Sequence, residues 1–341
     1  MKKNRIFSRL AALFGQKNGE QYASIVHMSQ NFRAMELNIK AFGYDLAHRL
    51  AADLPHRENL RPQQVGLESK LATQSDIESD WLAYWCQEIR CAVLYHRKIW
   101  EDAFILQALY EAGCMRPGAT GLGFGCGEEP IPSLLARHGV KVTATDLDPE
   151  RSSKKGWIRS GEHAGSLDKV FKPDIIDRET FDRLVEHRFV DMNAIPPDIR
   201  GYDFCWSMCA LEHLGNLQKG LDFVENALAC IRPGGVAVHT TEFNLDDDLP
   251  TIESGYTVLY QKKHMEALAR RLAAQGHVVR PFNFDPGNGP MDNFIDIPPW
   301  QPQQPSGMVE PALPDVRHLK ICKTGHRVTC IGIIITKGGT T

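Results

Sequence analysis

The segment Gly121-Leu-Gly-Phe-Gly-Cys-Gly127 constrains the fold of this chain more than any other stretch. It joins a strand-like run at 119–124 to an apolar helical run at 131–138. Its glycines let the backbone turn sharply and approach a ligand without obstruction by side chains. Pro132 suits the first turn of the next helix, whose amino end would face a bound small molecule. We therefore predict a strand, a glycine loop and a helix that share a ligand site.

The chain continues with alternating strand-like and helix-like segments. Strands are expected at 140–145, 187–190, 202–208 and 235–241, helices at 217–231 and 263–275, and last strands at 278–284 and 327–336. Such alternation implies right-handed crossovers and a parallel sheet covered on both faces. The predicted fold class is α/β, with one domain over 117–341 that carries a proline-rich insertion at about 285–320.

Residues 1–116 form a predicted N-terminal helical region. Trp81 and Trp85 lie about one helical turn apart, as do Trp100 and Phe104. This spacing favours a helix that packs its aromatic rings into a core.

Asp146 ends the second predicted strand, nineteen residues beyond Gly127. A carboxylate at this place can accept hydrogen bonds from both hydroxyls of a ribose. A solvated loop aspartate is the alternative, and the glycine loop before it favours the ribose role.

One class of protein that this topology allows is the nicotinamide (NAD)-dependent oxidoreductases. Its GxGxxG fingerprint, counted from Gly123, would need glycine at position 128, where this chain has Glu128. A carboxylate at position 128 would repel the negatively charged pyrophosphate that such enzymes bind at a helix amino end. The sequence therefore disfavours a nicotinamide dinucleotide as the cofactor.

The five motifs in order resemble those of the class I S-adenosylmethionine-dependent methyltransferases. They are the glycine turn, Thr145-Asp146-Leu-Asp148, Val190-Asp191-Met192-Asn193, the stretch from Tyr202 through Leu211-Glu-His213, and Ile231-Arg-Pro-Gly-Gly235. The resemblance implies a Rossmann-like seven-stranded sheet with its last strand antiparallel, capped by the N-terminal helical region. It also implies S-adenosyl-L-methionine as cofactor, with contacts at Gly123, Phe124, Gly125, Gly127, Asp146, Leu147, Asp191, Met192 and Ser207.

One departure from the family pattern stands at Gly121. The family usually has an acidic residue there, two positions before its first glycine. Another residue must then support the methionine end of the cofactor. This departure keeps a non-catalytic cofactor-binding scaffold open as an alternative.

Catalysis needs few groups, because the methyl donor is already activated and alignment supplies much of the rate. His213, just after the fourth strand, and Glu242, at the end of the fifth, are the candidate bases. Asp246-Asp-Asp248 with Glu242 could hold a divalent metal, but solvated loop carboxylates are favoured, so no metal is expected.

The chain also resembles a bacterial group of methyltransferase-like proteins associated with surface-polysaccharide or sugar gene clusters. The segments that carry this resemblance are His96-Arg-Lys-Ile-Trp-Glu101, the glycine turn through Pro130, and Asp285-Pro-Gly-Asn-Gly-Pro-Met-Asp292. It implies an O-methyltransferase that acts on a small molecule or a sugar or glycan precursor.

The composition of the chain limits the classes of partner it can bind and indicates a cellular compartment. A net charge of −3 without a basic run argues against a nucleic-acid partner. The nine cysteines form no CxxC pair and are expected to be free thiols. No stretch suits stable membrane insertion, so the expected location is cytoplasmic, and the oligomeric state stays open.

Overall fold

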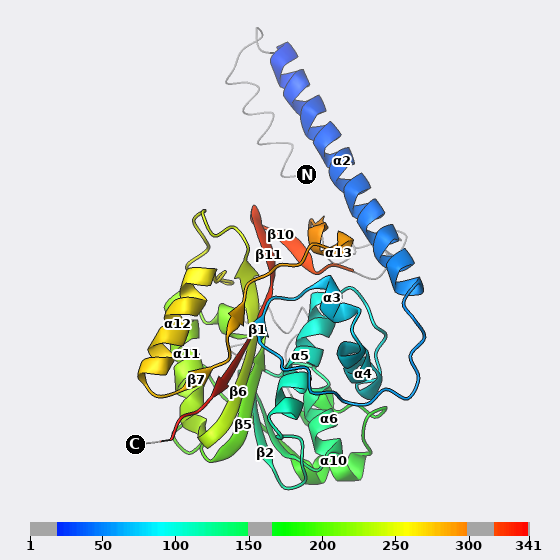
Figure 1. Cartoon of the computed structure of the whole chain (residues 1–341). Helices are drawn as coiled ribbons and strands as arrows, with labels where there is room; N and C mark the ends of the chain where they lie inside the picture. Colours follow the sequence, from blue (N-terminus) through cyan, green and yellow to red (C-terminus); the bar gives the residue numbers. More distant parts are fainter. Residues whose placement is uncertain (1–18, 149–165, 299–316, 340–341) are drawn as a thin grey trace.

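The computed structural model describes residues 19–148, 166–298 and 317–339. Part of the predicted insertion, 299–316, lies outside these residues. The described chain forms a twisted sheet between two layers of helices, with one long helix projecting from the body (Figure 1).

The sheet has the strand order β4-β3-β2-β5-β6-β11-β10-β9. Strands β2 to β6 pair in parallel, and β11 runs antiparallel to β6. The expected α/β sheet with an antiparallel last strand is therefore confirmed. The central strands are β2 (Thr120–Phe124), β3 (Lys141–Asp146), β4 (Val185–Phe189), β5 (Tyr202–Met208), β6 (Ile231–Asn244) and β11 (His326–Thr336).

The strand expected at 278–284 is broken into two short pieces. β7 (Val278–Val279) pairs with β11, whereas β8 (Phe282–Asn283) pairs with β1 (Ser69–Lys70) in a separate two-stranded sheet. Pro281 lies between them and has no N–H to donate to a ladder. Because β10 (Lys320–Lys323) and β9 (Ile295–Asp296) extend the edge next to β11, the main sheet has nine strands in the described chain instead of seven.

Helices cover both faces of the sheet. One face carries α4 (Asp80–Glu88), α5 (Arg97–Glu111), α6 (Ile131–Arg137) and α10 (Arg178–Leu184), and the other carries α11 (Leu217–Cys230) and α12 (Lys262–Ala274) (Figure 1). The short helices are α3 (Gln74–Ile77), α9 (Leu167–Val170), α13 (Pro290–Asn293) and the 3-10 helix η2 (Leu211–His213).

Helix α5 packs across β5, β6 and β11. A Cβ at Gly332 of β11 would overlap the Phe104 ring, so this glycine permits the close approach. Trp100 and Phe104 are fully buried and stacked, 4.8 Å between ring centroids, which confirms the predicted aromatic core. The predicted boundary at 116/117 separates α5 from the sheet, yet both contribute to one hydrophobic core.

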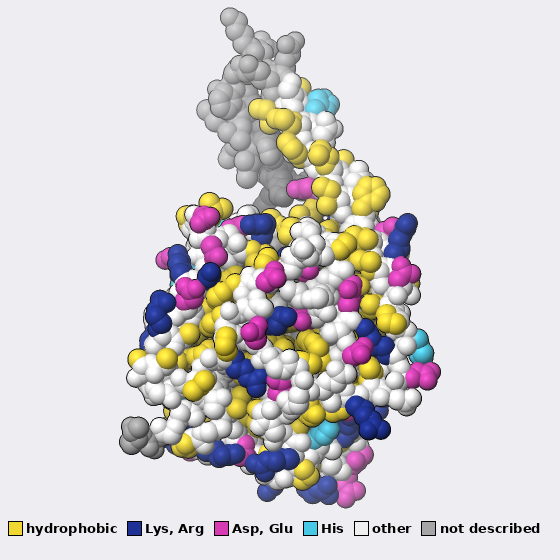
Figure 2. Space-filling view, in the orientation of Figure 1, with side chains coloured by type: hydrophobic (Ala, Val, Ile, Leu, Met, Phe, Trp, Pro, Cys, Tyr) yellow, Lys and Arg dark blue, Asp and Glu magenta, His cyan; other side chains and the backbone are white. Residues whose placement is uncertain are grey.

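Helix α2 (Gly19–Ala52) projects from the body (Figure 1). Hydrophobic side chains are visible along its surface (Figure 2). Within the described residues, no helix is both long enough and apolar enough to cross a bilayer.

Candidate cofactor and acceptor site

The glycine turn adopts a backbone that side chains would disfavour. Gly125 has φ +61° and Gly127 has φ +53°, both in the left-handed region. A Cβ on Gly125 would lie 3.0 Å from the Ala210 side chain, and one on Gly123 would lie 2.5 Å from the Trp206 ring. The turn is therefore closely packed as well as sharply bent.

Asp146 ties this turn to the neighbouring strand. Its Oδ2 accepts a hydrogen bond from the Gly127 N–H at 3.2 Å, and its Oδ1 accepts one from the Leu147 N–H at 2.7 Å. Thr145 Oγ1 donates to the Gly123 carbonyl at 2.8 Å. A carboxylate has about four acceptor positions, so hydroxyl donors can bind in addition. The two features that the sequence predicted as one site thus lie together.

The other predicted cofactor contacts divide into two sets. Met192 lies beside the turn, because its Sδ would be 3.6 Å from a Cβ on Gly125, and Asp191 precedes it in the same loop. The Phe124 ring instead packs in the core against Phe223, at 5.1 Å between centroids. Ser207 is fully buried and bonded to His239 Nδ1 at 2.8 Å. The side chains of Phe124 and Ser207 therefore point away from the turn.

The structure gives a steric reason for the departure at Gly121. A Cβ at this position would lie 2.5 Å from Cζ of the Phe204 ring on β5. An acidic side chain at position 121 would therefore overlap the Phe204 ring where it now lies.

Two buried carboxyl groups, those of Glu129 and Asp102, lie near the glycine turn. Glu129 Oε1 accepts a hydrogen bond from the indole of Trp206 at 2.5 Å. Among the described residues, Glu129 Oε2 and Asp102 Oδ1 have no hydrogen-bond partner. Burial, and the neighbouring Glu101, raise the pKa of Asp102 to about 7. Burial raises the pKa of Glu129 well above its usual range, and Asp102 and Asp146 add to the effect.

The oxygens of Glu129 and Asp102 that have no partner within the described chain show whether the site suits a nucleoside that carries an amino acid. A buried carboxyl without a partner costs free energy unless a ligand cation pairs with it. The methionine end of S-adenosylmethionine has an ammonium group that can donate to these oxygens, so the two carboxyl groups fit that cofactor. The sequence analysis did not single out Glu129 or Asp102. Glu129 follows Gly127 by two residues, so its place in the sequence was a signal, whereas Asp102 on α5 reaches this region only through the fold.

A polar cluster lies under the start of α5. Glu101 is fully buried and accepts hydrogen bonds from Cys209 Sγ at 2.8 Å, Thr240 Oγ1 at 2.5 Å and Cys330 Sγ at 3.1 Å. Burial opposes its ionisation, but Lys98 and Arg97 lower its pKa. Cys209, directly after β5, has φ +44°, a strained backbone of the kind found at functional sites.

The same cluster has the composition of a metal site. One atom each from Glu101, Cys209 and Cys330 lie within 4.8 Å of one another. However, Lys98 Nζ is 3.5 Å from Glu101, and Arg97 Nη1 is 3.7 Å from Cys330 Sγ. Two cations beside the ligand atoms already neutralise the carboxylate and would repel a metal ion. The arrangement favours a hydrogen-bonded cluster.

Glu242 lies on β6 between two cations. Its oxygens pair with Arg97 Nη1 at 2.9 Å and Lys323 Nζ at 2.6 Å. Burial opposes ionisation of Glu242, but the two cations prevail and lower its pKa to about 2. Such a carboxylate is a weak proton acceptor, so this geometry does not favour Glu242 as a base. Asp246, predicted as a possible metal partner of Glu242, is bonded to Arg327 at 2.6 Å.

His213 lies in η2, at the rim beyond β5. Its Nδ1 is 2.9 Å from the Tyr256 carbonyl, an arrangement in which Nδ1 carries the proton. Nε2 is then the nitrogen with the lone pair.

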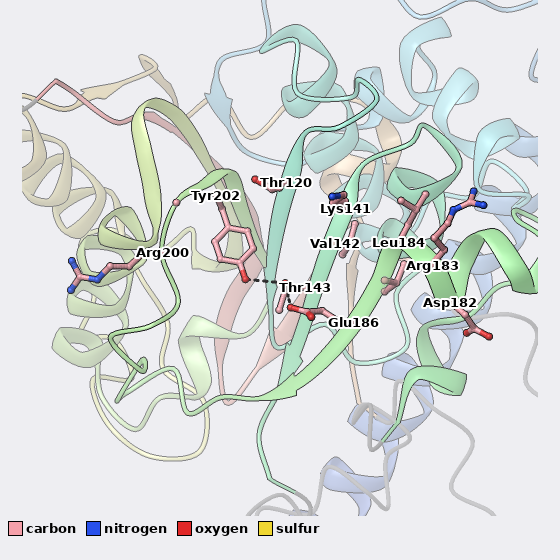
Figure 3. A pocket seen from close by; sticks show the side chains of 12 residues that line it. Thr120, Lys141, Val142, Thr143, Asp182, Arg183, Leu184, Glu186, Arg200 and Tyr202 are labelled. Carbon is pink, nitrogen blue, oxygen red and sulfur yellow. Dashed lines mark hydrogen bonds between the residues drawn. The ribbon is translucent and has the colours of Figure 1, made fainter.

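A hollow of about 520 Å³ opens at the amino ends of the parallel strands, opposite the ends that carry the glycine turn (Figure 3). Thr120, Lys141 and Tyr202 line it at the amino ends of their strands. Thr143 joins Tyr202 OH, at 2.9 Å, to Glu186, at 2.7 Å. Ligands of open α/β sheets bind at the carboxyl ends of the strands, so this hollow is separate from the cofactor site.

The sheet order and the glycine turn bonded to Asp146 define a nucleoside-binding α/β protein of the class I methyltransferase type. A family model described as a methyltransferase domain matches residues 94–283, and the chain belongs to this family of S-adenosylmethionine-dependent enzymes. The nicotinamide alternative is thereby set aside.

The comparisons also find individual relatives. The malonyl-[acyl-carrier protein] O-methyltransferase of Salmonella typhimurium is 27% identical over 133 residues, 38% of this chain and 49% of that protein. The chain thus spans about half the length of this curated relative.

Solved structures that resemble the chain include two further methyltransferases. One, from Methanosarcina mazei, is 13% identical over 67% of this chain and 96% of its own, with a TM-score of 0.37. The other, the magnesium protoporphyrin IX methyltransferase of Synechocystis with bound SAH, is 9% identical over 90% of this chain and 99% of its own, with a TM-score of 0.39.

Proposed function

We propose that this chain transfers a methyl group from S-adenosylmethionine to a hydroxyl of a small molecule or a sugar or glycan precursor. The observation that carries the proposal is the pair of hydrogen bonds that Asp146 accepts from the backbone N–H groups of Gly127 and Leu147. These two bonds hold the Asp146 carboxylate, which we propose binds the ribose, in a fixed position beside the glycine turn.

Each end of the cofactor has a proposed partner on this chain. Asp146 accepts the ribose hydroxyls, and Glu129 with Asp102 holds the ammonium group. The left-handed backbone at Gly125 and Gly127 turns the chain toward the cofactor, and Met192, after Asp191, lies beside Gly125. When bound, the cofactor supplies an electrophilic methyl group on a sulfonium.

The acceptor is proposed to lie beyond the ends of β5 and β6, between η2 and the start of α5. Glu101 holds the Cys209 and Thr240 side chains in place there. His213 Nε2 would take the proton that the acceptor hydroxyl loses when its oxygen replaces sulfur on the methyl carbon, and S-adenosylhomocysteine (SAH) would be the product that leaves. Glu242 orients Arg97 and Lys323.

The binding test uses Asp146→Asn, which keeps one acceptor oxygen for the turn. We expect at least about tenfold weaker binding of S-adenosylmethionine or SAH by calorimetry, because a charge-assisted bond to a hydroxyl contributes roughly 1.5–3 kcal/mol. Glu186→Gln, in the hollow at the other edge, is the matched control and should bind as the unmodified chain does. Equal affinity in both variants would refute the cofactor site.

The catalytic test follows SAH formation with a panel of hydroxyl acceptors, sugars included. His213→Gln should lower kcat by about 10²–10⁴-fold, the usual contribution of a general base, with cofactor affinity unchanged. His56→Gln, on an exposed loop, is the control. Tight cofactor binding without transfer to any acceptor would favour the scaffold alternative.

A further inference from the structure

Helix α2 is anchored to the body by one face near its end. Lys40 Nζ and Tyr44 OH each contact Asp296 at 2.8 Å, and Ala47 is fully buried. A Cβ at Gly43 would overlap the Phe294 ring, so the helix approaches the body closely there. The helix before Lys40 extends away from the body (Figure 1).

The projecting part has an apolar row with a regular spacing. Successive members are 3, 4, 3, 4 and 3 residues apart, and each side chain is between 54% and 72% exposed: Ile25, Met28, Phe32, Met35, Ile39 and Phe42. Figure 2 shows hydrophobic side chains along this helix. A mean spacing of 3.5 residues is the a/d heptad pattern of a coiled coil. We call this row the α2 seam.

The residues beside the seam suit a second copy of the same helix. The flanking e and g positions hold Ser29, Asn31, Glu36 and Asn38, so a single charge borders the seam. In a parallel pair, Asn31 of one helix faces Glu36 of the other, and its amide can donate to the carboxylate. In an antiparallel pair centred on the seam, e positions face e positions, so Glu36 of one helix faces Ser29 of the other. Neither arrangement opposes like charges.

The charges do not suit a membrane surface. A surface-bound helix is rich in Lys and Arg on its polar face. Over Gly19–Ala52, the basic residues are Arg33, Lys40 and Arg49, and Lys40 is bonded to Asp296. The narrow seam is also typical of helix pairing rather than of burial in lipid.

We infer that α2 pairs with α2 of a second copy of this chain, through the α2 seam, to form a homodimer. Eighteen residues from Ile25 to Phe42 give a paired length of about 27 Å at 1.5 Å per residue. The seam lies outside the proposed cofactor site, so association and cofactor binding can be measured separately.

The test is sedimentation equilibrium of the full chain. The unmodified chain should be a dimer, and Phe32→Asp, which places a charge at the centre of the seam, should weaken association by at least about tenfold. Leu37→Asp is the matched control, because Leu37 is exposed on the same helix but lies off the seam. It should associate as the unmodified chain does. SAH affinity reports that each variant is folded.

Three results would overturn the inference. One is a monomer at concentrations up to about 100 µM, where even weak specific pairs associate. Another is equal weakening by both substitutions. The third is a monomeric chain that binds vesicles of phosphatidylserine and phosphatidylcholine and loses this binding in Phe32→Asp.

Discussion

Asp102 and Glu129 show how this chain supplies the acidity that position 121 lacks. Phe204 occupies the space where an acidic side chain on β2 would lie. The two buried carboxyls come instead from α5 and from the loop before α6. In both, burial favours the neutral form, so each carries a cost to stability that a bound cation would relieve.

Asp102 gives a pH-dependent prediction at this scale. Its pKa rises from 3.8 to about 7 on folding, so the folded state holds the proton more tightly. Stability from this group is complete below about pH 4 and is lost as the pH rises toward 7, by about 4 kcal/mol.

The variant Asp102→Asn should therefore unfold at a higher temperature than the unmodified chain at pH 8, without ligand. The gain should shrink as the pH falls toward 4, and SAH should bind more weakly at pH 8. Thermal unfolding and calorimetry at several pH values measure both effects. Equal stability at pH 8 would contradict the assignment.

At the scale of elements, β6 and α5 are joined by an ion triad. Glu242 holds Arg97 of α5 and Lys323 of β10. Its pKa falls from 4.5 to about 2 on folding, so this stabilisation is present above about pH 4.5 and is lost as the pH falls through 2.

Glu242→Gln should cost about 3–5 kcal/mol of stability, because it leaves the two cations without their carboxylate. Chemical denaturation at pH 7 measures this cost. The pH–rate profile of the unmodified enzyme should show no limb from Glu242 between pH 5 and 9. A variant with full stability and lost turnover would restore Glu242 as a candidate base.

The elements also show what local sequence can predict. The parallel strands were predicted within a few residues, because most of them are short apolar or β-branched runs bounded by turn residues, although β4 is largely polar. The strand at 278–284 was predicted whole, although Pro281 divides it between two sheets. The cluster around Glu101 could not be predicted, since Cys209, Thr240 and Cys330 meet it only after folding.

At the scale of the whole molecule, we predict that the body and α2 have separate functions. The proposed cofactor residues lie at the ends of the central strands, in the loops after them and on α5, whereas α2 contacts the body mainly through its last turns, at Lys40, Tyr44 and Ala47. The dimer would thus join two sites without contributing residues to either.

A chain that begins at residue 37 lacks four of the six seam residues. It should be monomeric, bind SAH as the full chain does and change in stability by about 0.5 kcal/mol or less, as exposed positions usually do. Light scattering and calorimetry test this. A large loss of SAH affinity would show that α2 supports the cofactor site.

The contact between Gly121 and Phe204 links two positions that are 83 residues apart. Placing an acid at position 121 would require a smaller residue at 204 in the same step, because either substitution alone would destabilise the chain. An acid beside the intact ring has no room, and a trimmed ring beside glycine leaves a void. A single substitution at 121 or 204 therefore lowers the stability of this chain, and only the two together could give the acidic residue that the family usually has at position 121.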